Sequence, residues 1–226
     1  MRLHIANKNY SSWSLRPWVL MQHLGIAFEE KLYSFHGDTW DELKALSPNS
    51  RVPMLEADGI KVWDSLAIVE YLADRFPGVW PEDKEARIFA RCTAAEMHSG
   101  FSELRNLCPM NCALRIDVKD WTPALLWDWA RIDQIWSEGL SRFGGPFLAG
   151  AAFTAADAFF APVAFRAQTY SPALSAASSA YVDRILALPT MQDWYQAALK
   201  EPWKEAHHEE EAAAAGVIRQ DFRVSA

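Results

Sequence analysis

The first third of the chain alternates between strand-like and helix-like patterns of hydrophobic positions. Residues 2–6 alternate as in a strand, residues 7–12 are polar and predict a turn, and apolar positions recur at helical spacing through 15–24. Residues 27–33 alternate again and predict a second strand. A right-handed crossover makes these two strands parallel and places the polar turn at the carboxyl end of the first strand, where open α/β sheets bind ligands.

The following segment completes a small mixed sheet. Residues 40–46 predict a short helix, and an Asp-Gly pair predicts a hairpin turn between strands at 53–56 and 60–63. Ser65 is a candidate N-cap for the helix that follows. Parallel pairing followed by a hairpin predicts a mixed four-stranded sheet, and we expect residues 1–78 to form a thioredoxin-like α/β domain.

The remainder of the chain has the pattern of helices. We expect a linker at 79–83 and an all-α domain, a helical bundle without convincing strands, over 84–226. The clearest helix covers about 123–143, where large apolar residues recur every three or four positions after the cap Thr122. The tail after residue 201 is rich in His, Glu and Ala and predicts a marginal or mobile helix.

Composition and charge exclude several classes of function. Of the 226 residues, 50% are hydrophobic and 23% are charged, which is the balance of a globular protein. The formal net charge is −7 and no run of Lys and Arg occurs, so we expect no nucleic-acid partner. The N-terminal residues lack the pattern of a signal peptide, and no long apolar stretch occurs. We therefore expect a cytoplasmic protein that does not enter a membrane.

The cysteines point to free thiols. Cys92, Cys108 and Cys112 form no paired framework, which is typical of a reducing compartment. Cys108 and Cys112 are spaced like a metal-binding pair, but no further ligand lies near them in the sequence, so we expect structural thiols and no metal. The polar turn contains no cysteine, which disfavours thiol-disulfide exchange through an enzyme mixed disulfide.

Three short motifs lie at separated positions of the predicted N-terminal domain. They are Tyr-Ser-Ser-Trp-Ser-Leu-Arg-Pro at 10–17, Arg-Val-Pro-Met-Leu at 51–55 and Asp-Ser-Leu-Ala-Ile-Val-Glu-Tyr-Leu at 64–72. A fourth, at 147–157, joins Phe-Leu-Ala-Gly to a Thr154–Asp157 capping box ahead of an apolar run. In order and spacing these motifs resemble those of cytosolic glutathione transferases, and the serine motif is most similar to the zeta-type and related bacterial branches.

The chemistry of glutathione gives the serine motif a role. The reactive form of glutathione is the thiolate, and an ordinary thiol with a pKa of about 8.5 is mostly protonated at neutral pH. A hydrogen bond from the Ser11 hydroxyl, together with the N–H groups and dipole of the first helix, would favour the anion. We therefore expect Ser11 to be catalytic, with a plain helix cap as the alternative. Ser12 and Ser14 are the rival hydroxyls, and Tyr10 is disfavoured because tyrosine-using branches carry theirs nearer the first strand.

The resemblance also assigns residues to the binding of glutathione. It implies a cis peptide bond before Pro53, so that the main chain of Val52 pairs with the cysteinyl group as an added strand would. Asp64 and Ser65, at the start of a helix, are placed for the γ-glutamyl ammonium and carboxylate. Without the other motifs, an ordinary trans proline and a simple helix cap would explain Pro53 and Ser65.

Two parts of the site have several candidates each. The glycine carboxylate of glutathione requires a cation, which Lys44, His36 or Arg51 could supply, and we count Arg51 among the glutathione-binding residues. We expect the electrophile to bind between the two domains. The candidate lining residues are Asn9, Trp13, His98, Phe101 and Arg105.

The activity that the resemblance implies is conjugation, in which the glutathione thiolate attacks a small, largely apolar electrophile. The alternatives are glutathione-dependent cis-trans isomerisation of the maleylacetoacetate type and a non-catalytic ligand-binding module of the same fold. Trp13 stands where the zeta pattern has a cysteine, which argues against the isomerase. The resemblance also implies a homodimer.

Overall fold

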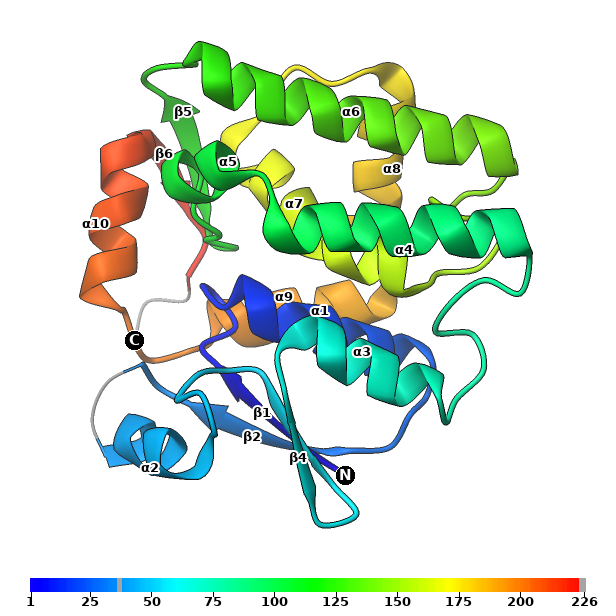
Figure 1. Cartoon of the computed structure of the whole chain (residues 1–226). Coiled ribbons are helices and arrows are strands. Elements are labelled where there is room, and N and C mark those ends of the chain that lie inside the picture. Colours follow the sequence, from blue (N-terminus) through cyan, green and yellow to red (C-terminus); the bar gives the residue numbers. More distant parts are fainter. Residues whose placement is uncertain (36–37, 224–226) are drawn as a thin grey trace.

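The chain folds into an N-terminal α/β domain and a larger helical domain packed against it (Figure 1). The structure is a computed structural model that describes residues 1–35 and 38–223. The strands of the first domain are β1 (Arg2–Ala6), β2 (Glu29–Tyr33), β3 (Met54–Ala57) and β4 (Ile60–Trp63). Its helices are α1 (Ser12–His23), α2 (Asp38–Leu46) and α3 (Ser65–Ala73).

The four strands form the predicted mixed sheet, in the order β2-β1-β3-β4. β1 and β2 are parallel, whereas β1 with β3 and β3 with β4 are antiparallel. Leu3 of β1 lies opposite Leu55 of β3, and both side chains are fully buried in one core with Val19 and Leu72 from the helices. The thioredoxin-like fold expected for this domain is therefore confirmed.

The helical domain surrounds one central helix, α7. Its helices are α4 (Lys84–Ser99), α5 (Ser102–Leu107), α6 (Pro123–Phe143), α7 (Ala155–Tyr170), α8 (Ala176–Leu186), α9 (Pro189–Leu199) and α10 (Ala206–Ala215). Nearly every residue of α7 is buried, because α7 packs against α4 and α8 of its own domain and against α1 of the first. A helix that is apolar on all sides is stable only at such an interior position.

The helical domain also contains a two-stranded antiparallel sheet, which the sequence analysis did not predict. β5 (Leu114–Val118) pairs with β6 (Gly216–Asp221), beside α10 at one side of the domain (Figure 1). The expectation of a domain without strands was therefore wrong, and the tail forms helix α10 followed by strand β6. Alternation in Leu-Arg-Ile-Asp-Val signalled the first strand, but its partner is distant in sequence, so no turn signal joined the two.

Salt bridges and hydrogen bonds hold the C-terminal segment against the first domain. The Tyr10 hydroxyl donates to the carboxylate of Glu209 on α10, at 2.7 Å. Arg223, which follows β6, pairs with both Glu209 and Asp221, at 2.7 and 2.6 Å. The Arg223 side chain is 9% exposed, and its Nη1 donates to the Tyr10 hydroxyl at 3.3 Å, which links the segment to the first domain.

The helix caps agree with the sequence at two of three positions. Thr122 accepts the Leu125 N–H at 3.2 Å and begins α6 at the predicted residue, and the predicted capping box begins α7. At α3, however, the cap is Asp64, whose carboxylate accepts the Leu66 N–H at 2.8 Å. The expected cap, Ser65, is the first helical residue instead. Both residue types cap helices well, so sequence could not choose between them.

Asp157 connects the capping box to the centre of the helical domain. Its fully buried carboxylate accepts the N–H groups of Leu148 and Thr154, at 3.0 and 2.9 Å, and the Tyr181 hydroxyl, at 3.0 Å. One side chain thus joins the loop before α7, the start of α7 and the middle of α8.

We predict that Asp157→Ala lowers the free energy of unfolding by about 3 kcal/mol or more, because it leaves several buried donors without acceptors. Asp157→Asn, which keeps one acceptor oxygen, should cost about 1–2 kcal/mol. The exposed Asp193 of α9 gives a matched control, for which Asp193→Ala should change stability by less than about 0.5 kcal/mol. Denaturant unfolding followed by tryptophan fluorescence measures all three. A loss for Asp157→Ala no larger than that of the control would contradict the prediction.

Candidate functional site

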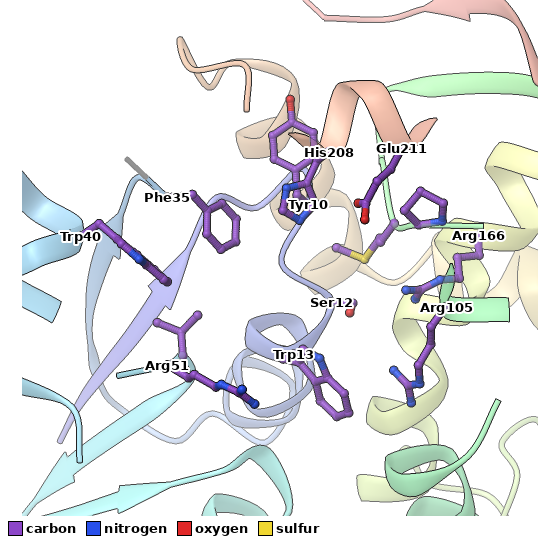
Figure 2. Close-up of a pocket in the computed structure, with 13 residues that line it drawn as sticks. Tyr10, Ser12, Trp13, Phe35, Trp40, Arg51, Arg105, Arg166, His208 and Glu211 are labelled. Atoms are coloured by element: carbon purple, nitrogen blue, oxygen red, sulfur yellow. The ribbon is translucent and has the colours of Figure 1, made fainter. Parts of the chain in front are cut away.

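Two adjoining cavities lie where the first helix meets the helical domain. The larger has a volume of about 390 Å³ (Figure 2). Its lining from the first domain includes Tyr10, Ser12, Trp13, Phe35, Trp40 and Arg51. Its lining from the helical domain includes Arg105, Pro109, Met110, Arg166, His208 and Glu211. Aromatic and charged side chains therefore share its walls.

The smaller cavity, of about 240 Å³, brings together five of the six residues predicted to bind glutathione, all except Ser11. These residues are Arg51, Val52, Pro53, Asp64 and Ser65. Trp13, Arg51 and Val52 also line the larger cavity, so the two spaces share one wall. The peptide bond between Val52 and Pro53 is cis, as the resemblance implies.

The start of α3 supplies an acceptor and a donor to the smaller cavity. Asp64 has a φ of 75°, a left-handed conformation that is rare for residues other than glycine and is often found at functional sites. Ser65 follows with a buried hydroxyl that has no hydrogen-bond partner among the described residues. His98 of α4 reaches the same place, with Nε2 3.5 Å from the Asp64 carboxylate, and burial lowers its pKa.

Three serine hydroxyls surround the first turn of α1, and they face in different directions. The Ser11 hydroxyl donates to Ser14 at 2.7 Å, and Ser14 also accepts the Ala6 N–H at 3.2 Å. Ser11 is not among the described lining residues of either cavity, whereas Ser12 lines the larger one. Figure 2 shows the Ser12 hydroxyl pointing into this space.

Three of the five residues expected to contact the electrophile do line a cavity. Trp13 lines both, Arg105 lines the larger and His98 lines the smaller. Asn9 and Phe101 are absent from the described lining of both. The Asn9 side chain instead accepts the main-chain N–H of residue 113 at 3.1 Å. Phe101 is buried at the start of α5.

Among the candidates for the glycine carboxylate, Arg51 lines both cavities. Lys44 pairs with Asp41 at 3.2 Å and is not among the described lining residues. His36 lies outside the described residues. Of the two candidates that the structure describes, Arg51 is the one placed at the site.

Several cavity residues were not found by sequence reasoning. His208 and Glu211 lie on α10, in the tail that was expected to be marginal or mobile. Arg166 lies in the apolar helix α7. Arg16, which is not among the described lining residues of either cavity, is fully buried in α1 beneath Trp13. An isolated arginine within an apolar helix was the available signal, because arginine is rarely buried without a partner.

Among residues 1–35 and 38–223, no group of three His, Cys, Asp or Glu side chains could hold a metal ion. No helix in this described part of the chain combines the length and apolar character needed to cross a bilayer.

Two family profiles match the chain. The N-terminal domain of glutathione S-transferase matches residues 10–75, and the C-terminal domain of glutathione S-transferase matches residues 94–197. With the fold described above, these matches show that the chain belongs to the glutathione S-transferase family.

Individual relatives are more distant. Maleylacetoacetate isomerase of Rattus norvegicus is 28% identical over 138 residues, which are 60% of this chain and 62% of the rat protein. The match thus spans less than two thirds of that relative. A glutathione transferase homolog from Burkholderia with bound glutathione is 22% identical, with a TM-score of 0.63 over 87% of this chain and 96% of its own. Glutathione S-transferase unclassified 2 from Bombyx mori is 15% identical, with a TM-score of 0.71 over 96% of this chain and 98% of the Bombyx mori chain. Both structures share the fold.

The three cysteines differ in exposure, and this difference predicts their reactivity. Burial raises the pKa of Cys108 to about 12 and raises that of the fully buried Cys112 as well, whereas Cys92 is exposed. Since only the thiolate reacts, and since a raised pKa keeps a thiol protonated until the pH approaches it, these two thiols should be inert.

We predict that an aromatic disulfide reagent at pH 8 modifies one thiol in the native protein and three after unfolding. Raising the pH to 9 should not expose a second reactive thiol, because pH 9 is still far below the pKa of Cys108. Cys92→Ser should abolish the native reaction. Rapid modification of two thiols in the folded protein would show that a buried cysteine is accessible and ionised.

Proposed function

We propose that this protein is a glutathione transferase that joins the glutathione thiolate to a small electrophile. The observation that carries the proposal is that five predicted glutathione-binding residues surround one cavity, which shares a wall with a second cavity between the domains. A transferase needs two adjoining sites of this kind, because it must hold two substrates in contact.

In this proposal glutathione occupies the smaller cavity. The Asp64 carboxylate binds the γ-glutamyl ammonium, and the Ser65 hydroxyl with the N–H groups at the start of α3 binds the γ-glutamyl carboxylate. The main chain of Val52 pairs with the cysteinyl group, and Arg51 binds the glycine carboxylate. The sulfur then lies near the first turn of α1, next to the larger cavity.

The protein favours the thiolate through the positive end of α1 and a serine hydroxyl. The thiol proton leaves to solvent, the sulfur electron pair forms a bond to the electrophilic carbon, and the leaving group departs with its own electron pair. The protein contributes ionisation and proximity, and no covalent enzyme intermediate is needed.

Two hydroxyls compete for the sulfur. The family resemblance assigns Ser11, and its contact with Ser14 supports this role, because the Ser14 hydroxyl can turn to donate to Ser11 while Ser11 donates to the sulfur. The cavity lining favours Ser12, whose hydroxyl already faces the larger space. We propose Ser11, with Ser12 as the rival.

Ser11→Ala should raise the pKa of bound glutathione by about one to two units and lower kcat by about tenfold or more, because the thiolate loses a charge-assisted hydrogen bond. Affinity for glutathione should change little, since the main-chain and charged contacts remain. Ultraviolet titration of the thiolate and calorimetry measure the two quantities.

Ser12→Ala and Ser14→Ala are the matched controls. We expect Ser12→Ala to leave the thiol pKa within about half a unit of wild type and Ser14→Ala to raise it only partly. A shift in Ser12→Ala without one in Ser11→Ala would assign the role to Ser12. No shift in any variant would assign the ionisation to the N–H groups and dipole of α1.

A second candidate function is glutathione-dependent isomerisation, which is favoured by the relative named maleylacetoacetate isomerase. Assays of a generic aryl halide and of maleylacetoacetate, each with glutathione, separate conjugation from isomerisation. Tight glutathione binding without turnover of either compound would favour a non-catalytic binding module.

We also infer that each chain has domains at 1–78 and 84–226. We infer further that two chains form a homodimer and that the protein is cytoplasmic. The unpaired cysteines support a reducing compartment, and exposed apolar side chains such as Trp63, 46% exposed, and Ile88, 54% exposed, are available for an interface. Sedimentation at micromolar concentration should give twice the chain mass of 25.6 kDa. A monomer under these conditions would contradict the inference.

A further inference from the structure

Three arginines lie together beside the larger cavity. Arg105 of α5 and Arg166 of α7 line the cavity, and Figure 2 shows both reaching it from the same side. Arg16 of α1 lies behind them. The Arg16 and Arg105 guanidinium carbons are 4.0 and 4.6 Å from the centroid of the Trp13 ring, so one indole holds two guanidiniums through cation–π contacts.

Main-chain carbonyls fix the orientation of each arginine. Arg105 Nε donates to the carbonyl of residue 100 at 2.9 Å, and its Nη2 donates to that of residue 97. Arg166 Nε donates to the carbonyl of residue 108 at 2.8 Å. Arg16 Nε donates to that of residue 159 at 3.3 Å. These bonds hold the guanidiniums in place but leave their positive charge uncompensated.

No carboxylate neutralises this cluster. Within the described residues, Arg16, Arg105 and Arg166 form no ion pair with Asp or Glu. Both terminal nitrogens of the fully buried Arg16 lack any hydrogen-bond partner among these residues. An unpaired buried charge is costly, and proteins keep one where a ligand or a function uses it.

The electrostatics agree with this geometry. Burial lowers the pKa of all three arginines, to about 10 for Arg105, and repulsion from Arg166 adds to the effect for Arg105 and Arg16. Asp64 and Asp128 oppose the shift only weakly. An anion placed among the three would offset this repulsion and favour the charged form of each arginine.

Glutathione itself does not account for the cluster. Its proposed anion-binding groups, Ser65 and Arg51, line the smaller cavity, whereas neither Arg105 nor Arg166 is among the described residues there. One described carboxylate lines the larger cavity. It belongs to Glu211, which pairs with His207 at 3.3 Å.

We propose that the second substrate carries an oxyanion, a carboxylate in the simplest case, which Arg105 and Arg166 bind, and an apolar body. This inference rests on the proposed function and specifies its electrophile. Phe35 and Trp40, with ring centroids 5.1 Å apart, form the opposite wall and contact the apolar body (Figure 2). Arg16, behind Arg105 and Arg166, adds to the positive electrostatic potential at the anion subsite. The substrate is thus amphipathic, not simply apolar.

Equilibrium binding tests the anion subsite without any turnover. We compare 4-nitrobenzoate with 4-nitrobenzamide, which has nearly the same shape but no charge, by calorimetry on the wild-type protein saturated with glutathione. The benzoate should bind at least ~10-fold more tightly, as expected for charge-assisted hydrogen bonds to two guanidiniums. Arms with 4-nitrobenzenesulfonate and 4-nitrophenyl phosphate show which oxyanion fits best. Equal affinity for all four compounds would overturn the proposal.

Variants then assign the preference to the two arginines. Arg166→Met and Arg105→Met should each bring benzoate affinity down to that of the benzamide, while glutathione affinity stays within about twofold of wild type. Arg142→Met, at an exposed arginine of α6, is the matched control and should keep the full preference. If the methionine variants unfold, Arg166→Lys serves instead, because it keeps the charge and loses the fork geometry. A preference unchanged in every folded variant would refute the assignment.

Turnover separates this inference from the proposed function. The two substrates compared in the turnover assay are 4-chloro-3-nitrobenzoate and 4-chloro-3-nitrobenzamide. Glutathione sulfur replaces chloride in either compound, and chloride leaves with the bonding pair. The benzoate should have at least ~10-fold higher kcat/KM, and Arg166→Met should bring the kcat/KM of the benzoate down to that of the benzamide, with little change for the benzamide.

No turnover of either compound, with benzoate binding intact, would refute the transferase and leave the anion subsite standing. An equal loss for both compounds, with a raised glutathione pKa, would mean that the arginines serve only the thiolate.

Discussion

The polar turn between β1 and α1 is buried between the two domains, and its main chain depends on both for hydrogen bonds. A buried turn cannot use water to satisfy its donors and acceptors, so other groups must do so. The Glu201 carboxylate accepts the N–H groups of Lys8 and Asn9, at 2.6 and 3.3 Å. The Trp194 indole donates to the Lys8 carbonyl at 2.8 Å, and the N–H of residue 112 donates to the Asn9 carbonyl at 3.2 Å. The helical domain thus completes the structure of a turn that belongs to the first domain.

This arrangement sets the position of everything around the cavities. The turn leads directly into α1, so holding it fixes the serines of the first turn and the Trp13 ring. The Lys8 side chain adds a further contact, since it pairs with Glu30 at 2.8 Å and lies 5.0 Å from the Trp18 ring centroid. Glu201 also precedes α10, the helix that brings His208 into the larger cavity. One buried turn therefore fixes the serine-bearing start of α1 relative to the C-terminal wall of the larger cavity.

Local signals predicted much of this molecule. The bounds of α6, its cap Thr122 and the capping box of α7 follow from short-range spacing, because the groups that satisfy a helix end lie within a few residues of it. The pairing of β5 with β6 joins distant segments, and no local pattern encodes it. Asn9 shows the same limit on a smaller scale. It was expected to face the electrophile because it lies in the turn, but its side chain is used for an interdomain hydrogen bond to residue 113.

Trp13 lies between the two cavities, and its contacts give a large aromatic side chain at this position a physical role. A small side chain there could not separate two cavities or hold two guanidiniums. The indole does both, since it lines each cavity and packs on Arg16 and Arg105, with His98 at its edge, 5.3 Å between ring centroids. Removing an arginine with unpaired terminal nitrogens from water is costly, and the attraction of its guanidinium to an aromatic face offsets part of that cost. Trp13 and the arginines are thus parts of one arrangement, in which an indole shared by the two cavities holds positive charge beside the larger one.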